Sequence, residues 1–162
     1  MVTKINKAAV ALAGILLLVC GCRKHEEVFF DTPFVRLEDV NGASSLSVDR
    51  NLDNLLTEIR IVVSASKNYF TEPIVVEYEI IPGDGLKEGS DFKVQASTMS
   101  PQTFSPGTYS LPVRVIWYKT DNFDPDKDNT LTFRLTRTSL PEMLLGCPGK
   151  DAIKKEFIFT KL

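Results

Sequence analysis

Apolar and polar residues alternate with a period of two from Val28 to the end of the chain, and the alternation breaks at Gly, Pro, Asn and Asp. This pattern predicts short strands that each bury one face. In one of them, Ile59, Ile61 and Val63 form the apolar stripe. The expected strands cover residues 34–40, 58–65, 74–81, 91–96, 109–118, 131–136 and 156–160.

The predicted strands are joined by clusters of turn-forming residues, such as Pro82-Gly83-Asp84-Gly85, and helix signals are nearly absent. Only residues 49–56 and 140–145 could hold a helical turn. Many short strands separated by turns favour two packed antiparallel sheets. We therefore expect one all-β domain, an immunoglobulin-like antiparallel β-sandwich of about seven or eight strands.

Two residues of the strand expected at 109–118 carry specific predictions. Pro112 cannot donate a hydrogen bond to a neighbouring strand, so it should lie at a sheet edge or a bulge. Trp117 continues the apolar stripe of Val113 and Val115 and should therefore lie in the core.

The first residues have the layout of a secretory signal peptide. Lys4 and Lys7 precede an unbroken apolar run that extends from Ala8 to Val19. The run is shorter than the roughly 20 residues that a helix needs to cross a bilayer, so a cleaved signal fits better than a transmembrane helix. A buried core helix fits worse still, because the run has no polar face.

The end of this run, Val19-Cys20-Gly21-Cys22, resembles the lipobox of bacterial lipoproteins. There, an aliphatic residue, a small residue and Gly or Ala precede an obligate Cys, whose sulfur takes the diacylglycerol. The resemblance implies that residues 1–21 are removed and that Cys22 is acylated; Cys20 is the rival acceptor, but bulky Val19 precedes it. Two or three acyl chains anchor a protein stably, since each buried methylene contributes about 0.8 kcal/mol.

Residues 22–29 are expected to form a flexible tether, and the folded domain is expected over residues 30–162. The tract Arg23-Lys24-His25-Glu26-Glu27 resembles the charged segment that follows the lipidated Cys in surface-exported lipoproteins of the Bacteroidetes. The alternative is a plain solvated tether. The implied location is the outer membrane, with either a surface-exposed or a periplasmic domain.

Charge and residue counts narrow the range of functions. The chain has 19 Lys+Arg and 21 Asp+Glu, so it repels nucleic-acid phosphate and we expect no nucleic-acid partner. His25 is the single histidine, which excludes a His-Glu-x-x-His zinc site and a well-positioned Ser-His-Asp triad. Glu77 and Glu79 share one strand face and fit the solvent side better than a glycosidase pair. We therefore expect no enzymatic activity.

Several segments occur in the order typical of one family: EPIVVEYEI (72–80), EGSDF (88–92), FSPG (104–107), YSLPVRVIW (109–117) and LTFRLT (131–136). Over residues 57–138 the chain thereby resembles the Calx-beta domain and the Calx-beta-like modules of Bacteroidetes lipoproteins. The resemblance implies a β-sandwich. Residues 140–153 are longer than a minimal connection of the family and are expected to form a surface loop.

The resemblance also implies calcium as a cofactor. In Calx-beta domains of the ion-exchanger type, an acidic loop binds Ca²⁺ together with other acids at the same end of the domain. Carried over to this chain, the ligands would be Asp91, Asp121, Asp124, Asp126 and Asp128. The alternative is a solvated acidic loop in which Asp and Asn serve turn chemistry.

Exposed aromatic rings can stack on sugars, and Tyr69, Phe70 and Phe123 fall at expected loop ends, so they are the candidate ligand contacts. Cys147 is the one thiol left after signal removal and acylation of Cys22. No intrachain disulfide can then form, and Cys147 should be a partly buried loop residue.

These observations predict a lipid-anchored outer-membrane or cell-surface lipoprotein that acts as a non-catalytic binding or adhesion module. Its partners would be the membrane, through the lipid, and a protein or glycan on the cell surface. The alternative is a structural or accessory subunit of an envelope complex, such as a glycan-uptake system, that binds protein through an exposed sheet edge.

Overall fold

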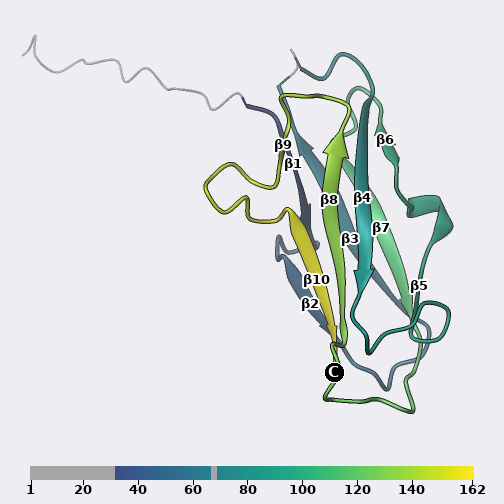
Figure 1. The fold of residues 1–162 in the computed structure, drawn as a ribbon. Helices are drawn as coiled ribbons and strands as arrows, with labels where there is room; N and C mark the ends of the chain where they lie inside the picture. Colours follow the sequence, from purple (N-terminus) through teal and green to yellow (C-terminus); the bar gives the residue numbers. More distant parts are fainter. Residues whose placement is uncertain (1–31, 67–68) are drawn as a thin grey trace, which may run out of the picture. The chain divides into compact units, whose positions relative to one another are not determined.

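The computed structural model describes residues 32–66 and 69–162, which form a β-sandwich of two five-stranded sheets (Figure 1). Within these residues the only helical element is one 3₁₀ turn, η1 (Ala96–Thr98). A membrane-spanning helix of sufficient length and hydropathy is absent from the same residues. The predicted all-β sandwich is confirmed. The predicted signal segment 1–21 and the predicted tether 22–29, with Cys22, lie outside the described residues.

Each sheet draws strands from both halves of the sequence. The first contains, in spatial order, β5 (Phe92–Val94), β7 (Ser110–Trp117), β3 (Leu55–Ser64), β1 (Phe34–Glu38) and β9 (Leu144–Leu145). The second contains β2 (Ser45–Val48), β10 (Glu156–Lys161), β8 (Thr130–Thr138), β4 (Ile74–Pro82) and β6 (Gln102–Phe104). Most neighbours are antiparallel, as expected, but β1 pairs with β9 and β10 pairs with β2 in parallel.

The core lies between the sheets and consists of the alternate residues of each strand that face inward. On β7 the buried residues include Val115 and Trp117, and on β10 they are led by Phe157 and Phe159. The rings of Trp117 and Phe159 meet edge to face with their centroids 5.3 Å apart, so this contact joins the two sheets. The predicted core position of Trp117 is confirmed.

All the predicted strands are present, with ends that differ by a few residues. The strands that the pattern did not predict are β2, β6 and β9, each of four residues or fewer. In these three segments the alternation is too short to indicate a strand. β5 is equally short, but it lies inside the longer alternating run 91–96. Neither helical candidate forms a helix, because β3 begins within residues 49–56 and β9 lies at the end of residues 140–145.

Pro112 lies where β7 has a strand on one side only. It pairs with Arg60 of β3, whereas β5, on the other side, reaches only from Val115 to Trp117. The Pro112 carbonyl accepts a hydrogen bond from Gln102 Nε2 at 3.0 Å. The expected edge position of this proline is therefore confirmed locally, although β7 itself is an inner strand of the sheet.

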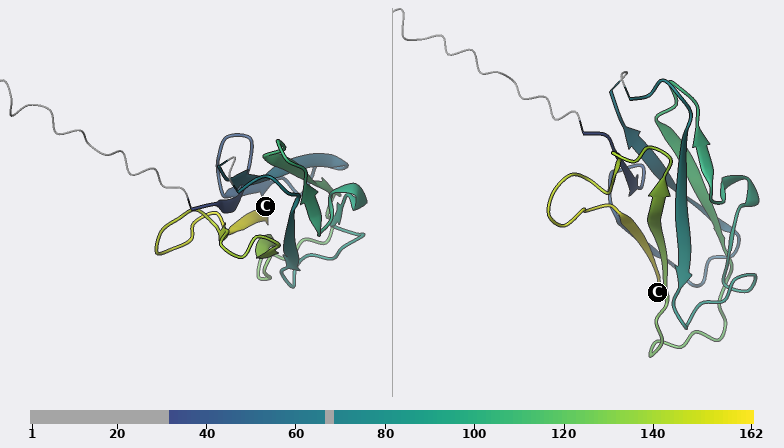
Figure 2. Two further views of the ribbon diagram at one scale, coloured as in Figure 1. Left: turned by 90° about the horizontal axis from the view of Figure 1, so that it is seen from above. Right: turned by 45° about the horizontal axis from the view of Figure 1, so that its top comes forward.

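The segment between β8 and β10 projects from the side of the sandwich (Figure 2). It contains β9 and the half-buried, free Cys147, whose backbone N–H donates to the Ile153 carbonyl at 2.7 Å. Met143 is buried and holds the segment to the core. The expectations of a surface loop and of a partly buried cysteine are both confirmed.

Candidate functional site

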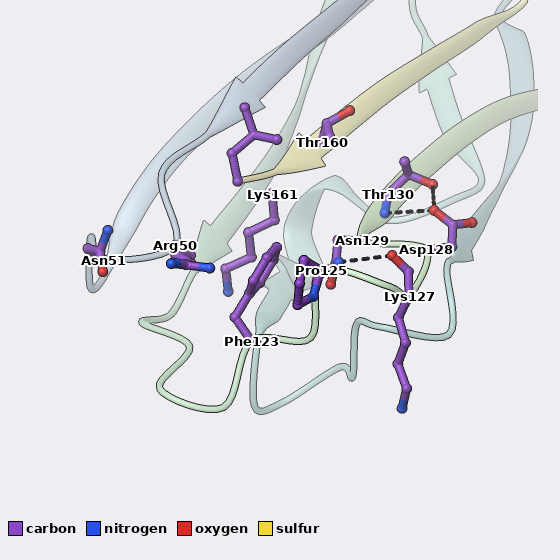
Figure 3. A pocket seen from close by; sticks show the side chains of 11 residues that line it. Arg50, Asn51, Phe123, Pro125, Lys127, Asp128, Asn129, Thr130, Thr160 and Lys161 are labelled. Carbon is purple, nitrogen blue, oxygen red and sulfur yellow. Dashed lines mark hydrogen bonds between the residues drawn. The ribbon is translucent and has the colours of Figure 1, made fainter.

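An open pocket of about 590 Å³ lies at the end of the sandwich where β2 and β10 end and β8 begins (Figure 3). We call it the end pocket. Its walls come from the turn after β2, the connection between β7 and β8, and the last residues of the chain. The lining residues are Arg50, Asn51, Phe123, Pro125, Lys127, Asp128, Asn129, Thr130, Thr160, Lys161 and Leu162.

Arg50 joins the walls of the end pocket. Its N–H donates to the Leu162 carbonyl at 2.9 Å, and its own carbonyl accepts from Thr120 N–H at 3.0 Å. Its guanidinium carbon lies 4.4 Å from the ring centroid of half-buried Phe123. A cation–π contact at such a partly exposed site contributes about 0.5–1 kcal/mol. One face of the Phe123 ring is therefore covered by the protein's own arginine.

Asn129 fixes the loop that carries Phe123. This buried side chain donates from Nδ2 to the carbonyls of Asp124 at 2.8 Å and Lys127 at 3.0 Å. The turn after β4 packs against it so closely that a Cβ at Gly85 would lie 2.4 Å from Asn129 Oδ1. Only glycine fits there without displacing the amide, so the two connections are held together.

Lys161 lies beneath the end pocket with its side chain fully buried. Its ammonium donates to the Tyr118 carbonyl at 2.7 Å, to Thr120 Oγ1 at 2.5 Å and to the Asp91 carbonyl at 3.1 Å. Burial lowers the pKa of Lys161 from its ordinary value, and the nearby Asp91 carboxylate opposes that shift. The positive charge of Lys161 is therefore stabilised by oxygens from the β4–β5 connection and from the β7–β8 connection.

The predicted calcium ligand Asp91 takes part in this arrangement. Its Oδ1 accepts from Thr120 Oγ1 at 2.5 Å and lies 3.6 Å from Lys161 Nζ, and its Oδ2 accepts from Lys87 N–H at 2.9 Å. Asp91 and Asp121 line one small pocket of about 310 Å³. Asp121 instead pairs with Lys119 at 2.6 Å, and this carboxylate raises the pKa of Lys119.

The other three predicted ligands form hydrogen bonds within their own connection and, through the Asp128 N–H, with the turn after β4. Asp124 Oδ1 accepts from Asp126 N–H at 3.0 Å, and Asp128 Oδ1 accepts from Thr130 N–H at 3.0 Å. Asp84 in turn accepts from Asp128 N–H at 2.9 Å. Among the described residues, no three Asp, Glu, His or Cys side chains are grouped so that they could hold a metal ion. The contacts are those of turn chemistry, and calcium binding stays a prediction from the resemblance.

The predicted aromatic contacts lie at opposite ends of the sandwich. Phe123 lines the end pocket, whereas Tyr69 and Phe70 follow β3 at the other end. The expected exposure of Phe70 is wrong: it is 5% exposed and meets Tyr109 edge to face, with centroids 5.0 Å apart. Tyr69 is half-buried. An apolar ring beside a loop can fold onto the core, which alternation along a strand does not reveal.

Glu77 and Glu79 lie on the outer face of β4, as expected. Glu79 pairs with Arg134 of β8 at 3.0 Å, and Glu77 lies 3.9 Å from Arg137. These are cross-strand ion pairs on the solvent-facing side of the sheet.

Neither Lys161 nor Arg50 was among the predicted site residues, and Asn129 was expected only to serve turn chemistry. For Lys161 a signal was present, because Phe157, Phe159 and Lys161 alternate on one face of β10 and all three are buried. A lysine that continues an apolar stripe indicates a buried charge. Nothing comparable marks Arg50, whose partners come from distant segments.

No family model and no curated protein matches the chain. Among solved structures the fold is similar to part of EndoBT-3987 from Bacteroides thetaiotamicron, crystallised with its Man5GlcNAc product. The TM-score is 0.51 at 14% sequence identity, and the match covers 77% of this chain and 30% of the other. The chain thus spans less than a third of that protein's length, and the similarity is one of fold.

Proposed function

We propose that this protein is a lipid-anchored binding module of the bacterial cell envelope, without catalytic activity. In this proposal residues 1–21 are removed, Cys22 carries the acyl chains, and residues 22–29 connect the lipid to a Calx-beta-like sandwich. The domain presents the end pocket to a protein or a glycan at the cell surface. The observation that carries the proposal is the position of the end pocket.

The chain enters the sandwich at the end opposite the end pocket. β1 begins at Phe34, which pairs with Ser64 at the last residue of β3. The other end of β3, Leu55, pairs with Trp117, which adjoins the buried Lys161. The ten residues of β3 separate these ends by about 30 Å at roughly 3.4 Å per residue. The end pocket therefore lies at the end of β3 that is farther from the start of β1.

The composition of the end pocket supports binding rather than chemistry. Concave sites that bind ligands are commonly apolar with a few convergent polar groups. Here Phe123, Pro125 and Leu162 supply apolar surface, while Arg50 and Lys127 supply cationic donors. Loops at the end of a rigid sandwich are typical carriers of recognition.

A second candidate function is that of an accessory subunit in an envelope complex. It is favoured by two exposed apolar side chains, Val40 at 61% and Ile153 at 62%. Their segments adjoin, because Leu37 N–H donates to the Lys154 carbonyl at 2.8 Å. The outermost strands of both sheets are short, which disfavours strand addition. A protein partner would therefore contact the exposed side chains of Val40 and Ile153 rather than a strand edge.

The lipid anchor is tested in cells grown with radiolabelled palmitate. We expect the wild-type protein to be labelled and to fractionate with the outer membrane, and Cys22→Ser to be unlabelled and to leave that fraction. Wild-type protein without label, or a Cys22→Ser protein that fractionates as its parent does, would overturn the proposal. Protease treatment of intact cells then distinguishes a surface-exposed domain from a periplasmic one, because a periplasmic domain resists digestion.

The binding surface is tested with two matched variants of the full chain, Arg50→Ala/Phe123→Ala and Ile153→Ser. Binding to a glycan array or to surface protein that falls about tenfold or more in the first variant alone supports the end pocket. Co-purification with a transporter that is lost in Ile153→Ser alone supports the accessory subunit. Thermal unfolding of both variants shows whether the fold is kept.

A further inference from the structure

The ammonium of Lys161 is buried with all of its protons paired. An unpaired buried ammonium is very costly, and an ammonium has three N–H donors to satisfy. In this protein the three go to Tyr118 O, Thr120 Oγ1 and Asp91 O, at 2.7, 2.5 and 3.1 Å. Each of the three N–H groups therefore has an acceptor within the protein, and Lys161 is only 1% exposed.

The surroundings of the nitrogen form a cation site. They comprise two backbone carbonyls, one hydroxyl and, at 3.6 Å, the carboxylate of Asp91, which the Thr120 hydroxyl orients at 2.5 Å. The Trp117 ring lies on another side, with its centroid 5.8 Å from Nζ. Carbonyl, hydroxyl and carboxylate oxygens are the ligands that proteins offer to hard cations. One carboxylate matches one positive charge.

The distances distinguish the kind of cation. Calcium takes six to eight oxygens at about 2.3–2.6 Å. The oxygens around Nζ are fewer, and those that accept its protons lie at 2.5–3.1 Å. This spacing suits ammonium or a monovalent ion of similar size, and the lysine side chain already fills the place.

We propose that the oxygen cage formed by Asp91, Tyr118 and Thr120 is a monovalent-cation site that the chain occupies with its own ammonium, that of Lys161. The built-in cation links the end of β10 to the residue before β5 and to the start of the β7–β8 connection. That connection also carries Phe123, so Lys161 is a positioning residue for the end pocket. This inference does not depend on the proposed function, because it concerns how the loops are held.

The test is rescue of Lys161→Ala by small cations, with the full chain purified in detergent. Removing one partner of a buried ionic network is strongly destabilising, so we expect the melting temperature to fall by about 10 °C. Added ammonium, potassium or ethylammonium chloride should restore at least about half of that loss, because an apolar cavity with a polar end remains. Tetramethylammonium has no N–H donor and should restore nothing beyond a general salt effect.

Two further variants serve as controls. Lys161→Met fills the space of the side chain without a charge, so it should lose stability and respond equally to all the chlorides. Lys127→Ala removes an exposed lysine of the same pocket and should melt as the wild type does. A Lys161→Ala protein that all cations stabilise equally would overturn the proposal, and so would rescue by calcium alone.

A measurement on the wild-type protein decides the question even if Lys161→Ala does not fold. An ammonium held by three buried acceptors exchanges its protons slowly with water. In ¹H–¹⁵N spectra at neutral pH we expect one lysine Nζ signal to persist at room temperature, with contacts to Thr120 and Trp117. Absence of any such signal, or a neutral amine at this position, would overturn the proposal.

Discussion

At the scale of single residues, buried polar groups take their properties from partners that lie far away in sequence. Tyr78 of β4 is 5% exposed, and its hydroxyl donates to the Thr98 carbonyl at 2.5 Å. The same carbonyl accepts from Gln102 Nε2 at 2.7 Å. Burial raises the pKa of Tyr78 to about 12. The phenol therefore stays protonated in the folded state at a pH where it ionises in the unfolded chain.

This shift predicts a loss of stability in alkali. Because the pKa of Tyr78 is higher in the folded state than its ordinary value of 10.0, its contribution is complete below pH 10 and disappears as the pH rises toward about 12. The free energy of unfolding should fall by up to about 1.4 kcal/mol per pH unit across this range. Urea unfolding of the wild type and of Tyr78→Phe between pH 9 and about 11.5 measures this pH dependence of the free energy of unfolding.

The Tyr78→Phe variant lacks the ionising group and keeps the ring. It should show a flatter pH dependence than the wild type in that interval. An identical slope in the two proteins would mean that Tyr78 does not ionise on unfolding in this range.

At the scale of elements, β1 is tied to the connection between β8 and β10 by one carboxylate. Arg36 donates to Glu38 from Nε at 2.9 Å and from Nη2 at 3.0 Å, and Lys154 donates to the same carboxylate at 2.7 Å. The hydrogen bonds from Arg36 and, to a lesser extent, from Lys154 lower the pKa of Glu38 to about 2, although burial opposes this shift. β1 and the connection between β8 and β10 are therefore joined by a contact that is sensitive to acid.

We expect the Glu38 contact to be lost in acid. Its pKa is lower in the folded state than its ordinary value of 4.5, so its contribution is complete above pH 4.5 and is lost as the pH falls toward about 2. The contribution at neutral pH is up to about 3 kcal/mol. Urea unfolding of wild type and Glu38→Gln from pH 6 to pH 2 should give curves that converge in acid, and a constant difference would contradict the assignment.

At the scale of the whole domain, stability depends on aromatic contacts across the two sheets. Phe159 of β10 is fully buried and touches Trp117 of β7, Phe133 of β8 and Phe157, with centroid separations of 5.3, 5.9 and 4.9 Å. Rings in this geometry contribute about 0.5–1.5 kcal/mol beyond their buried area. The cluster lies beside Lys161, so the core and the support of the end pocket are continuous.

Truncation of Phe159 should therefore be among the most damaging changes to the domain. We expect Phe159→Ala to lower the free energy of unfolding by about 3–5 kcal/mol, since it removes a large buried ring and leaves a cavity. Ile158→Ala, at the neighbouring position that is 36% exposed, should cost less than about 1.5 kcal/mol. Fluorescence of Trp117, the single tryptophan, follows the unfolding of both variants. Equal losses of unfolding free energy would contradict the assignment of Phe159 to the inner face and Ile158 to the outer face of β10.

The candidate site was less predictable than the strands that support it. Phe123 was predicted as a contact and lines the end pocket, yet its partner Arg50 belongs to a turn more than seventy residues earlier. The five aspartates were predicted as ligands of one calcium ion, and in three dimensions Asp91 lies beside Lys161 while Asp121 pairs with Lys119. The Lys119–Asp121 pair is local in sequence, whereas the contact between Asp91 and Lys161 joins residues seventy positions apart and depends on the packing of the strands.

The sequence by itself determined seven of the ten strands of the described residues and which face of each is buried, because alternation is a local property of a strand that buries one face. Only the tertiary structure decided which strands pair, that β2 and β9 add parallel edges, and that Phe70 turns inward. It also placed the ammonium of Lys161 among oxygens from two distant connections. Contacts of this kind depend on how the sheets pack, and packing is set by all the strands together.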